Sequence, residues 1–247
     1  MYACFFYETI KPFRRPFRYN GYIFIQEASM LINDQQFQDL LLRYSQETES
    51  GKRKKLEDVI WQAYGTVNTV LLLDMFGFSL LTRKYGIVHY LSMIRRMQLT
   101  VDPIIAGHGG RVIKFEADNC FAILPDPLSA VRAAITIQHA LRAANLITSD
   151  DLDVHVSIGI DYGKILVINN EDMFGDAVNR ACKMGEDIGV AGEILVTKDA
   201  MDLIPADAEI QGKLVELSIG GLTTSAYTIL YKANEEDQGV GINFPTI

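Results

Sequence analysis

The stretch VLLLDMFGFSLL, residues 70–81, places a strand, an acid and a turn in one short segment. Four apolar residues lead into the carboxylate of Asp74, and a Gly-containing turn then brings the chain to Ser79, where a helical pattern begins. Such a turn directs backbone N–H groups toward an anion, and the helix dipole favours negative charge there. A divalent cation between acid and anion would explain the arrangement. The alternative is that Asp74 only caps a turn, so the question is whether a second carboxylate reaches the same place.

The pattern around this stretch predicts an α+β fold with a ferredoxin-like βαββαβ core. Hydrophobic periodicity assigns a buried first strand, a long helix that can break at Gly86, a hairpin, a second helix and two further strands. In chain order these elements occupy residues 67–74, 79–107, 111–117, 119–125, 127–144, 152–161 and 163–168. Asp118 lies at the turn of the hairpin. Because this topology puts the hairpin beside the end of the first strand, we expect Asp74 and Asp118 to be neighbours.

Further elements flank this core. The region 172–189 predicts a loop that runs into a helix, 193–197 a strand, and the segments AEIQGKLVEL and SAYTILY a closing antiparallel pair. We divide the chain into four parts: an N-terminal extension at 1–32, a helical arm at 33–65, a main domain at 66–232 and a flexible tail at 233–247. The extension is expected to form two short strands around Asn20-Gly21 or to be poorly ordered, and Met30 is an alternative start.

The arm carries apolar residues at helical spacing, with a polar break around Gly51. It is either two helices or one frayed helix. Its apolar stripe needs a partner, which is either the following domain or a second copy of the chain, and the arm could then carry the signal of an upstream regulator. The basic run KRKK within it is interpreted as a solvated helix face.

Bulk properties limit the function classes. The chain has 247 residues and a formal net charge of −8, which argues against a nucleic-acid binder held by phosphate contacts. Its three cysteines form no CxxC pair, as expected for a reducing cytoplasm. No apolar run is long enough for a membrane span. A nucleotide site stays compatible with the acidic whole, because a metal and a few local cations can hold a triphosphate.

Two carboxylates brought together from a strand end and a hairpin turn repel each other, and a cation would neutralise them. Ligands that are all oxygen favour Mg²⁺ or Mn²⁺ over zinc. Two such ions per site can bridge triphosphate oxygens and activate a hydroxyl for in-line attack at phosphorus. The residues therefore predict a phosphoryl-transfer site built on Asp74 and Asp118.

From Thr66 to about Tyr231 the sequence resembles the class III nucleotidyl cyclase catalytic domain, the family of adenylate and guanylate cyclases. Four pieces carry the resemblance by their order and spacing: LLLDMFGFSLL, HGGRVIKFEAD, VSIGIDYGKI and DMFGDAVNRACKMGE. The resemblance implies that Asp74 and Asp118, with Met75, hold the two metal ions. It also implies that the backbone of the turn cradles the triphosphate, through Met75, Phe76, Gly77, Phe78 and Ser79.

The same resemblance assigns substrate and catalytic roles. Lys114 stands where adenylate cyclases carry the lysine that reads the purine, and Asp172 stands where they carry its partner acid. Guanylate cyclases typically have Glu and Cys there, so ATP is favoured over GTP. Asn179 resembles the asparagine that orients the ribose. Lys183, one helical turn later, occupies the position of an arginine that stabilises transition-state charge.

The resemblance implies an adenylate cyclase that converts ATP to 3′,5′-cyclic AMP and pyrophosphate in intracellular signalling. Family members combine groups from opposite chains, so a single copy implies a head-to-tail homodimer with two composite sites. The alternatives are a cyclase with another base choice, producing cyclic GMP or a pyrimidine cyclic nucleotide, and a non-catalytic nucleotide-binding module.

Three positions depart from the family pattern. Ala117 replaces a Gly before the second aspartate, Lys183 replaces Arg, and Ser218-Ile219 stand where many members carry a triphosphate-binding lysine. Simpler interpretations of the other site residues also exist: Lys114 could pair only with Glu116, and Asp172 could be an ordinary loop acid.

Overall fold

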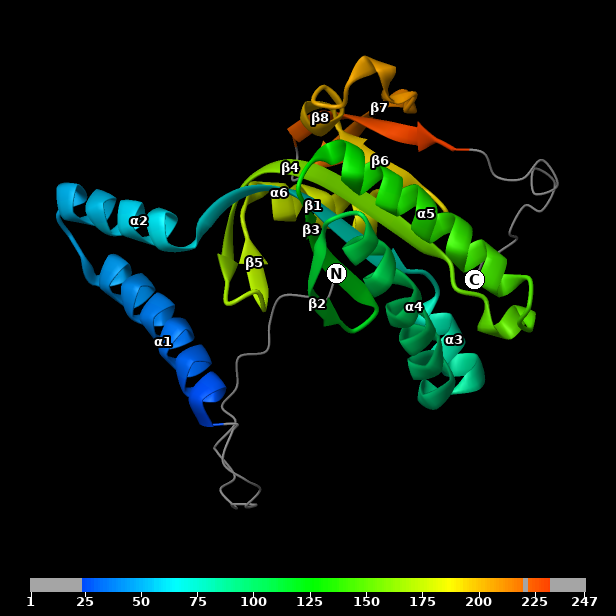
Figure 1. Ribbon diagram of the computed structural model, residues 1–247, viewed down its shortest axis with the longest axis horizontal. Coiled ribbons are helices and arrows are strands. Elements are labelled where there is room, and N and C mark those ends of the chain that lie inside the picture. Colours follow the sequence, from blue (N-terminus) through cyan, green and yellow to red (C-terminus); the bar gives the residue numbers. More distant parts are fainter. Residues whose placement is uncertain (1–23, 220–221, 232–247) are drawn as a thin grey trace.

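The computed structural model describes residues 24–219 and 222–231. Figure 1 shows them as a twisted sheet domain from which two N-terminal helices extend. These helices are α1 (Phe24–Gln46) and α2 (Ser50–Tyr64), so the arm has two helices with a break between them. The helix α1 begins earlier than the predicted arm, and the turn dipeptide Asn20-Gly21 lies outside the described residues.

The arm closes on itself and on the sheet. The rings of Phe37 and Tyr64 meet edge to face, with centroids 5.0 Å apart. Phe37, Leu40 and Ile60 also form a buried cluster with Ile168 of the sheet. The inner side of the arm stripe is therefore covered by the following domain. A dimer-forming role for the outer side stays a prediction.

The predicted βαββαβ core is confirmed. Its elements are β1 (Gly65–Met75), α3 (Phe78–Tyr85), α4 (Ile87–Gly107), β2 (Arg111–Glu116), β3 (Asn119–Leu124), α5 (Pro127–Asn145) and β4 (Val156–Ile168). The strands lie in the order β2-β3-β1-β4 and neighbours pair antiparallel, as in a ferredoxin-like sheet. The long helical stretch divides at Gly86, whose φ of 88° ends α3 and allows α4 to start in a new direction.

The extra C-terminal elements extend the same sheet. They are β5 (Asp172–Phe174), α6 (Asp176–Cys182), a π-helix (Lys183–Ile188), β6 (Ile194–Thr197), α7 (Lys198–Met201), β7 (Gln211–Ile219) and β8 (Leu222–Leu230), with short 3-10 turns at Asp150–Leu152 and Ala206–Ala208. The sheet continues as β4-β6-β8-β7, and β5 pairs with the end of β4. Among the described helices, none is both long and apolar enough to cross a bilayer.

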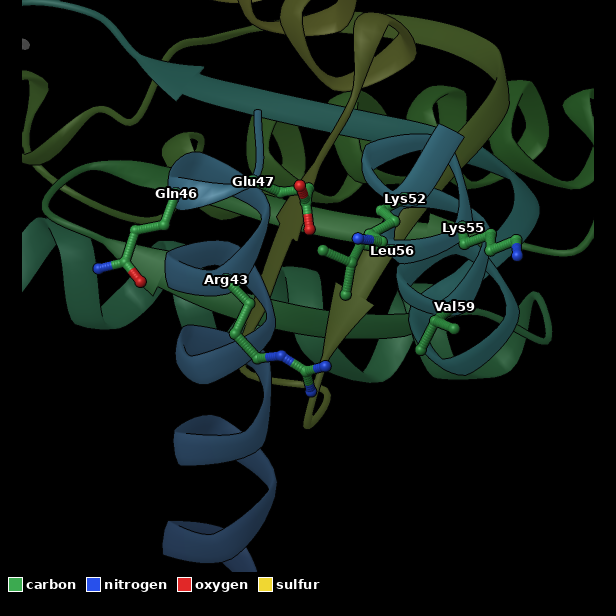
Figure 2. Close-up of a pocket in the computed structure, with 7 residues that line it drawn as sticks. All are labelled: Arg43, Gln46, Glu47, Lys52, Lys55, Leu56 and Val59. Carbon is green, nitrogen blue, oxygen red and sulfur yellow. The ribbon is translucent and has the colours of Figure 1, made fainter. Parts of the chain in front are cut away.

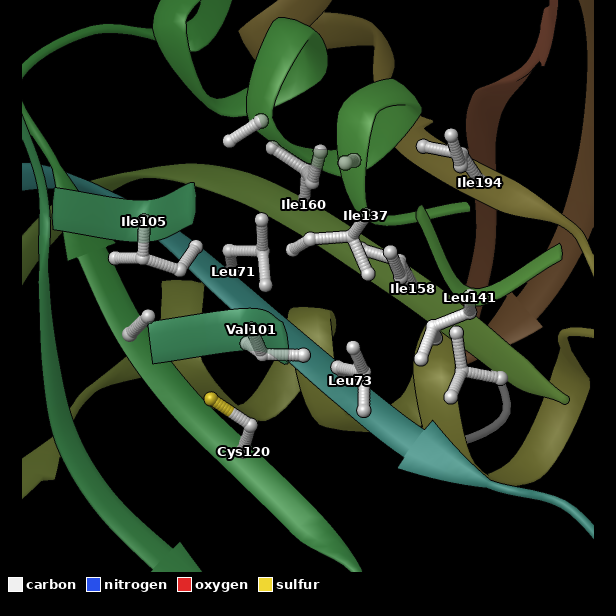
Figure 3. Close-up of a cluster of buried hydrophobic side chains, with 14 of the residues drawn as sticks. Leu71, Leu73, Val101, Ile105, Cys120, Ile137, Leu141, Ile158, Ile160 and Ile194 are labelled. Atoms are coloured by element: carbon white, nitrogen blue, oxygen red, sulfur yellow. The ribbon is translucent and has the colours of Figure 1, made fainter. Parts of the chain in front are cut away.

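The opening stretch is apolar at consecutive positions because both faces of β1 are buried. Leu71 and Leu73 pack with residues of α4 and α5, including Val101 and Ile137, as Figure 3 shows. Val70 and Leu72 point to the other face, where they meet α6. A strand covered on two sides reads as a continuous hydrophobic run rather than an alternating one.

One expected boundary is wrong. The segments 152–161 and 163–168, expected as two strands, form the single strand β4 from Val156 onward. The ladder with β1 continues through Gly163, which pairs with Asn68, and reaches Leu166 opposite Gly65. A glycine in a strand does not end it when the neighbouring strand supplies its hydrogen bonds.

The hairpin turn holds Ala117 in a left-handed conformation, with φ at 52°. An L-residue with a Cβ pays roughly 1–2 kcal/mol in that region, whereas Gly does not. We therefore expect Ala117→Gly to raise the free energy of unfolding by about 1 kcal/mol. Chemical denaturation measures the change. The matched control is Ala143→Gly on the exposed face of α5, which should lower it by about as much. A destabilised Ala117→Gly would contradict the turn geometry.

Candidate active site

The two predicted acids lie at the same end of the sheet. Asp74 is next to last in β1, and its partner in the β1–β3 ladder is Asn119. Asp118 directly precedes Asn119 in the β2–β3 turn. Burial, followed by repulsion from Asp118 and then from Glu186 and Asp187, raises the pKa of Asp74 to about 7. The cluster is electrostatically unfavourable, and a cation would relieve it.

The donor chemistry of this cluster fits Mg²⁺ or Mn²⁺. Its charged groups are carboxylates, which are the hard oxygen ligands that these ions prefer. Within residues 24–219 and 222–231, no three His, Cys, Asp or Glu side chains are grouped to hold an ion by themselves. Magnesium is commonly bound by one or two carboxylates while substrate phosphates complete its coordination. A two-acid site therefore suits a divalent metal whose remaining coordination positions a triphosphate can fill.

A buried tyrosine orients one of the acids. Tyr90 on α4 has no exposed surface, and its Oη donates a hydrogen bond to Oδ2 of Asp118 over 2.8 Å. Sequence reasoning did not identify Tyr90, because it belongs to an apolar helix stripe with Met93, Met97 and Val101. The available signal is general: a tyrosine inside such a stripe needs a partner for its hydroxyl group.

The turn after Asp74 has the expected strand–turn–helix form. Met75 is buried and pairs with Val156 of β4. The N–H of Phe76 donates to the carbonyl of His155 at 2.9 Å, so that N–H does not face a ligand. Gly77 has φ at 95° and precedes the first turn of α3, which begins at Phe78. The side chains of Phe78 and Ser79 lie outside the described residues. The N-terminal turn of α3 is thus the part of the predicted cradle that can meet an anion.

The structure brings Lys114 and Asp172 together. Nζ of Lys114 lies 3.1 Å from Oδ1 of Asp172 and 2.6 Å from Oε2 of Glu116, over the ring of Phe121. Burial opposes the charge of Lys114, but the hydrogen bonds to Glu116 and Asp172 outweigh it and raise its pKa. Both proposed partners of Lys114 are therefore present. Asp172 is the first residue of β5 rather than a loop acid.

Asn179 and Lys183 are both exposed. Asn179 lies in α6, and Lys183 begins the π-helix that continues it. Nζ of Lys183 forms an ion pair with Asp187 of the same helix. Single-turn π-segments often occur at functional sites because they redirect the side chains that follow. Here the π-helix carries Glu186 and Asp187 toward Asp74, whose pKa they raise.

Two glycines place the π-helix against the sheet. A Cβ on Gly159 would lie 2.1 Å from the carbonyl oxygen of Ala181, and a Cβ on Gly185 would lie 2.8 Å from Leu72. The hydroxyl of Ser157 donates to the carbonyl of Gly185 at 2.5 Å. This close approach explains why β4 carries Ser157 and Gly159 at this point. It also fixes the distance of the π-helix from the sheet.

A buried ionic network anchors α6 to the sheet, and sequence reasoning missed it. Asp161 on β4 is fully buried, with Nε of Arg180 at 2.6 Å and the hydroxyl of Thr197 at 2.5 Å. Burial raises the pKa of Asp161, against the hydrogen bonds from Thr197 and Arg180. Because Arg180 follows Asn179, this network also fixes the position of Asn179.

Removing Arg180 leaves the buried Asp161 carboxylate without a counter-charge. We expect Arg180→Ala to lower the free energy of unfolding by about 3 kcal/mol, measured by urea denaturation. The matched control is Lys198→Ala, which removes a surface ion pair with Asp202 and should give no measurable change. Equal stabilities for the two variants would show that the Asp161 network does not anchor α6.

The pocket in Figure 2 lies elsewhere. It has a volume of about 450 Å³ and lies between α1 and α2. The residues that line it are Arg43, Gln46, Glu47, Lys52, Lys55, Leu56 and Val59. None of the predicted site residues lines it.

A ferredoxin-like sheet with Asp74 and Asp118 at one end fits the class of nucleotidyl cyclase catalytic domains. Comparisons agree. The profile of the adenylate and guanylate cyclase catalytic domain matches residues 59–229. The chain therefore belongs to this family, whose members generally use divalent metal ions.

The matched proteins share limited sequence identity with this chain. "Putative adenylate cyclase 3" of Rhizobium meliloti is 32% identical over 116 residues, which is 47% of this chain and 19% of that protein. The adenylyl cyclase CyaB from P. aeruginosa superposes with a TM-score of 0.57 at 20% identity, covering 69% of this chain and 97% of that one. The guanylyl cyclase Cya2 superposes with a TM-score of 0.59 at 17% identity, covering 70% of this chain and 96% of that one. The structures show the fold, and they include both base specificities.

Proposed function

We propose that the chain is an adenylate cyclase, which converts ATP to 3′,5′-cyclic AMP and pyrophosphate. In this reaction the ribose 3′-oxygen loses its proton to solvent and forms a bond to the α-phosphorus. The bond from the α-phosphorus to the bridging oxygen of the β-phosphate breaks, and pyrophosphate leaves. No oxidant or further reactant is required, so the groups needed are those that bind, orient and neutralise.

The pair of Lys114 and Asp172 carries the choice of ATP. Adenine presents an acceptor at N1 beside a donor at N6, and an ammonium beside a carboxylate matches this pattern. The 3.1 Å contact between the two side chains supports this role, because it holds an ammonium group and a carboxylate side by side. Guanine presents a donor at N1, which would face the ammonium group of Lys114 without an acceptor.

The remaining residues have binding and orienting roles. Asp74 and Asp118 would hold Mg²⁺ or Mn²⁺, two ions per site, which supply charge neutralisation and activation of the 3′-hydroxyl. The N-terminal turn of α3 binds phosphate oxygens. Asn179 orients the ribose, and Lys183 places positive charge near the reacting phosphate.

The proposal includes a head-to-tail homodimer. In the described part of one chain, no hydrogen bond or ion pair links the Lys114–Asp172 pair to the two metal-site acids. Lys183 likewise binds Asp187 rather than either acid. We infer that a second copy brings the complementary groups of the two chains together around one ATP. We place this dimer in the cytoplasm, in intracellular signalling, with the arm as the route for an upstream regulator.

Two observations favour other functions. Glu116 lies beside Lys114 and offers a second carboxylate to the base, which would suit guanine. Lys183, the side chain proposed to stabilise the transition state, is neutralised by an ion pair with Asp187, as expected of a nucleotide-binding module without turnover.

One assay separates these functions. Purified protein is incubated with Mn²⁺ and, separately, each of the four ribonucleoside triphosphates, and products are resolved by chromatography. The proposal predicts cyclic AMP as the dominant product. Cyclic GMP or a pyrimidine cyclic nucleotide as the main product would instead show a cyclase with another base choice. Binding of ATP without any product would show a nucleotide-binding module without turnover.

A further inference from the structure

Asn119 lies next to the metal-site acids in two ways. It follows Asp118 in the chain and is the direct partner of Asp74 in the β1–β3 ladder. Side chains of residues directly opposed in an antiparallel pair project from the same face and are close at their Cβ atoms. The amide of Asn119 therefore stands beside the carboxylate of Asp74.

Glu186 fixes the orientation of that amide. Nδ2 of Asn119 donates to Oε1 of Glu186 over 3.0 Å. Because a carboxylate only accepts hydrogen bonds, the nitrogen must face Glu186 and the oxygen must face away. Glu186 comes from the π-helix, so the redirected helix explains how this partner arrives.

The amide oxygen has no partner. Oδ1 of Asn119 is buried and accepts no hydrogen bond from any described residue. A buried acceptor left unsatisfied costs about 1–3 kcal/mol and calls for an ion or water. Tyr90 already binds one oxygen of Asp118, which leaves the other oxygen available.

We propose that Oδ1 of Asn119 is a further oxygen ligand for a divalent cation held by Asp74 and Asp118. The inference rests on the proposed metal site. An amide oxygen is a hard ligand that suits Mg²⁺ and Mn²⁺. It also adds a ligand without adding negative charge to a site that already holds two carboxylates. Glu186 then acts as a positioning residue for this ligand.

Mn²⁺ alone is the probe, and its binding is followed by the loss of the free-ion electron paramagnetic resonance signal, without turnover. We expect Asn119→Ala to weaken Mn²⁺ binding at least about 10-fold and Asn119→Asp to restore it, since a carboxylate oxygen replaces the amide oxygen. The matched control is Asn145→Ala. Asn145 is the last residue of α5 and is hydrogen-bonded to the backbone of Val154, so its loss should leave Mn²⁺ affinity unchanged.

Two outcomes overturn the assignment. One is unchanged Mn²⁺ affinity in Asn119→Ala while Asp74→Asn loses it, and the other is no Mn²⁺ binding by the wild-type protein. Circular dichroism verifies that each variant is folded. The proposed function is judged separately by cyclic AMP formation, so a wild-type enzyme that makes cyclic AMP with an unaffected Asn119→Ala metal affinity rejects Asn119 alone.

Discussion

Asp74→Asn is expected to lower cyclic AMP formation by roughly 10³-fold or more, measured as initial rates with Mn²⁺ and ATP. The amide keeps the size of the side chain but loses the charge that neutralises a metal ion. Asp118→Asn should have an effect of the same order. Asp126→Asn serves as a control, because Asp126 caps α5 and is not in the site. Activity within a few-fold of wild type for Asp74→Asn would remove Asp74 from the metal site.

The same substitution has an opposite effect on the metal-free fold. The pKa of Asp74 is raised from 3.8 to about 7, so the folded state holds the proton more tightly than the unfolded state. Its contribution to stability is complete below about pH 4 and is lost as the pH rises through about 7. The amide of Asp74→Asn does not titrate, so the stability of this variant lacks that pH dependence.

In EDTA, the melting temperature of wild type relative to Asp74→Asn should therefore fall between pH 5 and pH 8. Thermal scans at both values measure the difference. A difference that is constant with pH would show that Asp74 is not held in the crowded, half-buried position described above.

Exchanging Lys114 and Asp172, the proposed base-recognition pair, should change the substrate. We expect Lys114→Glu combined with Asp172→Cys to lower kcat/KM for ATP by about 100-fold or more and to make GTP the better substrate. A glutamate can accept from the N1 and N2 donors of guanine, whereas it leaves the N1 acceptor of adenine facing a carboxylate. Competition between the two nucleotides, with both cyclic products quantified, measures the switch.

Glu116→Gln is the matched control, since Glu116 also contacts Lys114. It should retain the preference for ATP if Asp172 is the partner that matters. A double variant that still prefers ATP would separate Lys114 and Asp172 from base recognition. A preference for GTP in Glu116→Gln would transfer that role to Glu116.

Local pattern was sufficient to predict most of the fold. The apolar run before Asp74, the Gly86 break and the hairpin with Asp118 at its turn all follow from periodicity and turn chemistry. The prediction that Asp74 and Asp118 are neighbours also followed, because the topology of the core determines which ends meet. The strand at 152–161 was given the wrong end, because Gly163 reads as a break until the β1 ladder beside it is known.

The supporting residues of the site could not be found in this way. Tyr90 reaches Asp118 from a helix, and Glu186 reaches Asn119 from a π-helix whose extra residue per turn has no local sequence signal. The Asp161–Arg180 pair likewise joins residues on a strand and a helix. Such contacts depend on how distant segments pack in three dimensions. The spacing of residues in the sequence does not reveal them.

Mixing two inactive variants tests the central claim, a composite cyclase site shared by two chains. Asp74→Ala lacks a proposed metal ligand, and Asn179→Ala lacks the amide proposed to orient the ribose. Half of randomly mixed dimers are heterodimers, and each has one intact site of two, so we predict recovery of roughly a quarter of wild-type cyclic AMP formation. No recovery from folded, dimeric, ATP-binding partners would contradict the composite site.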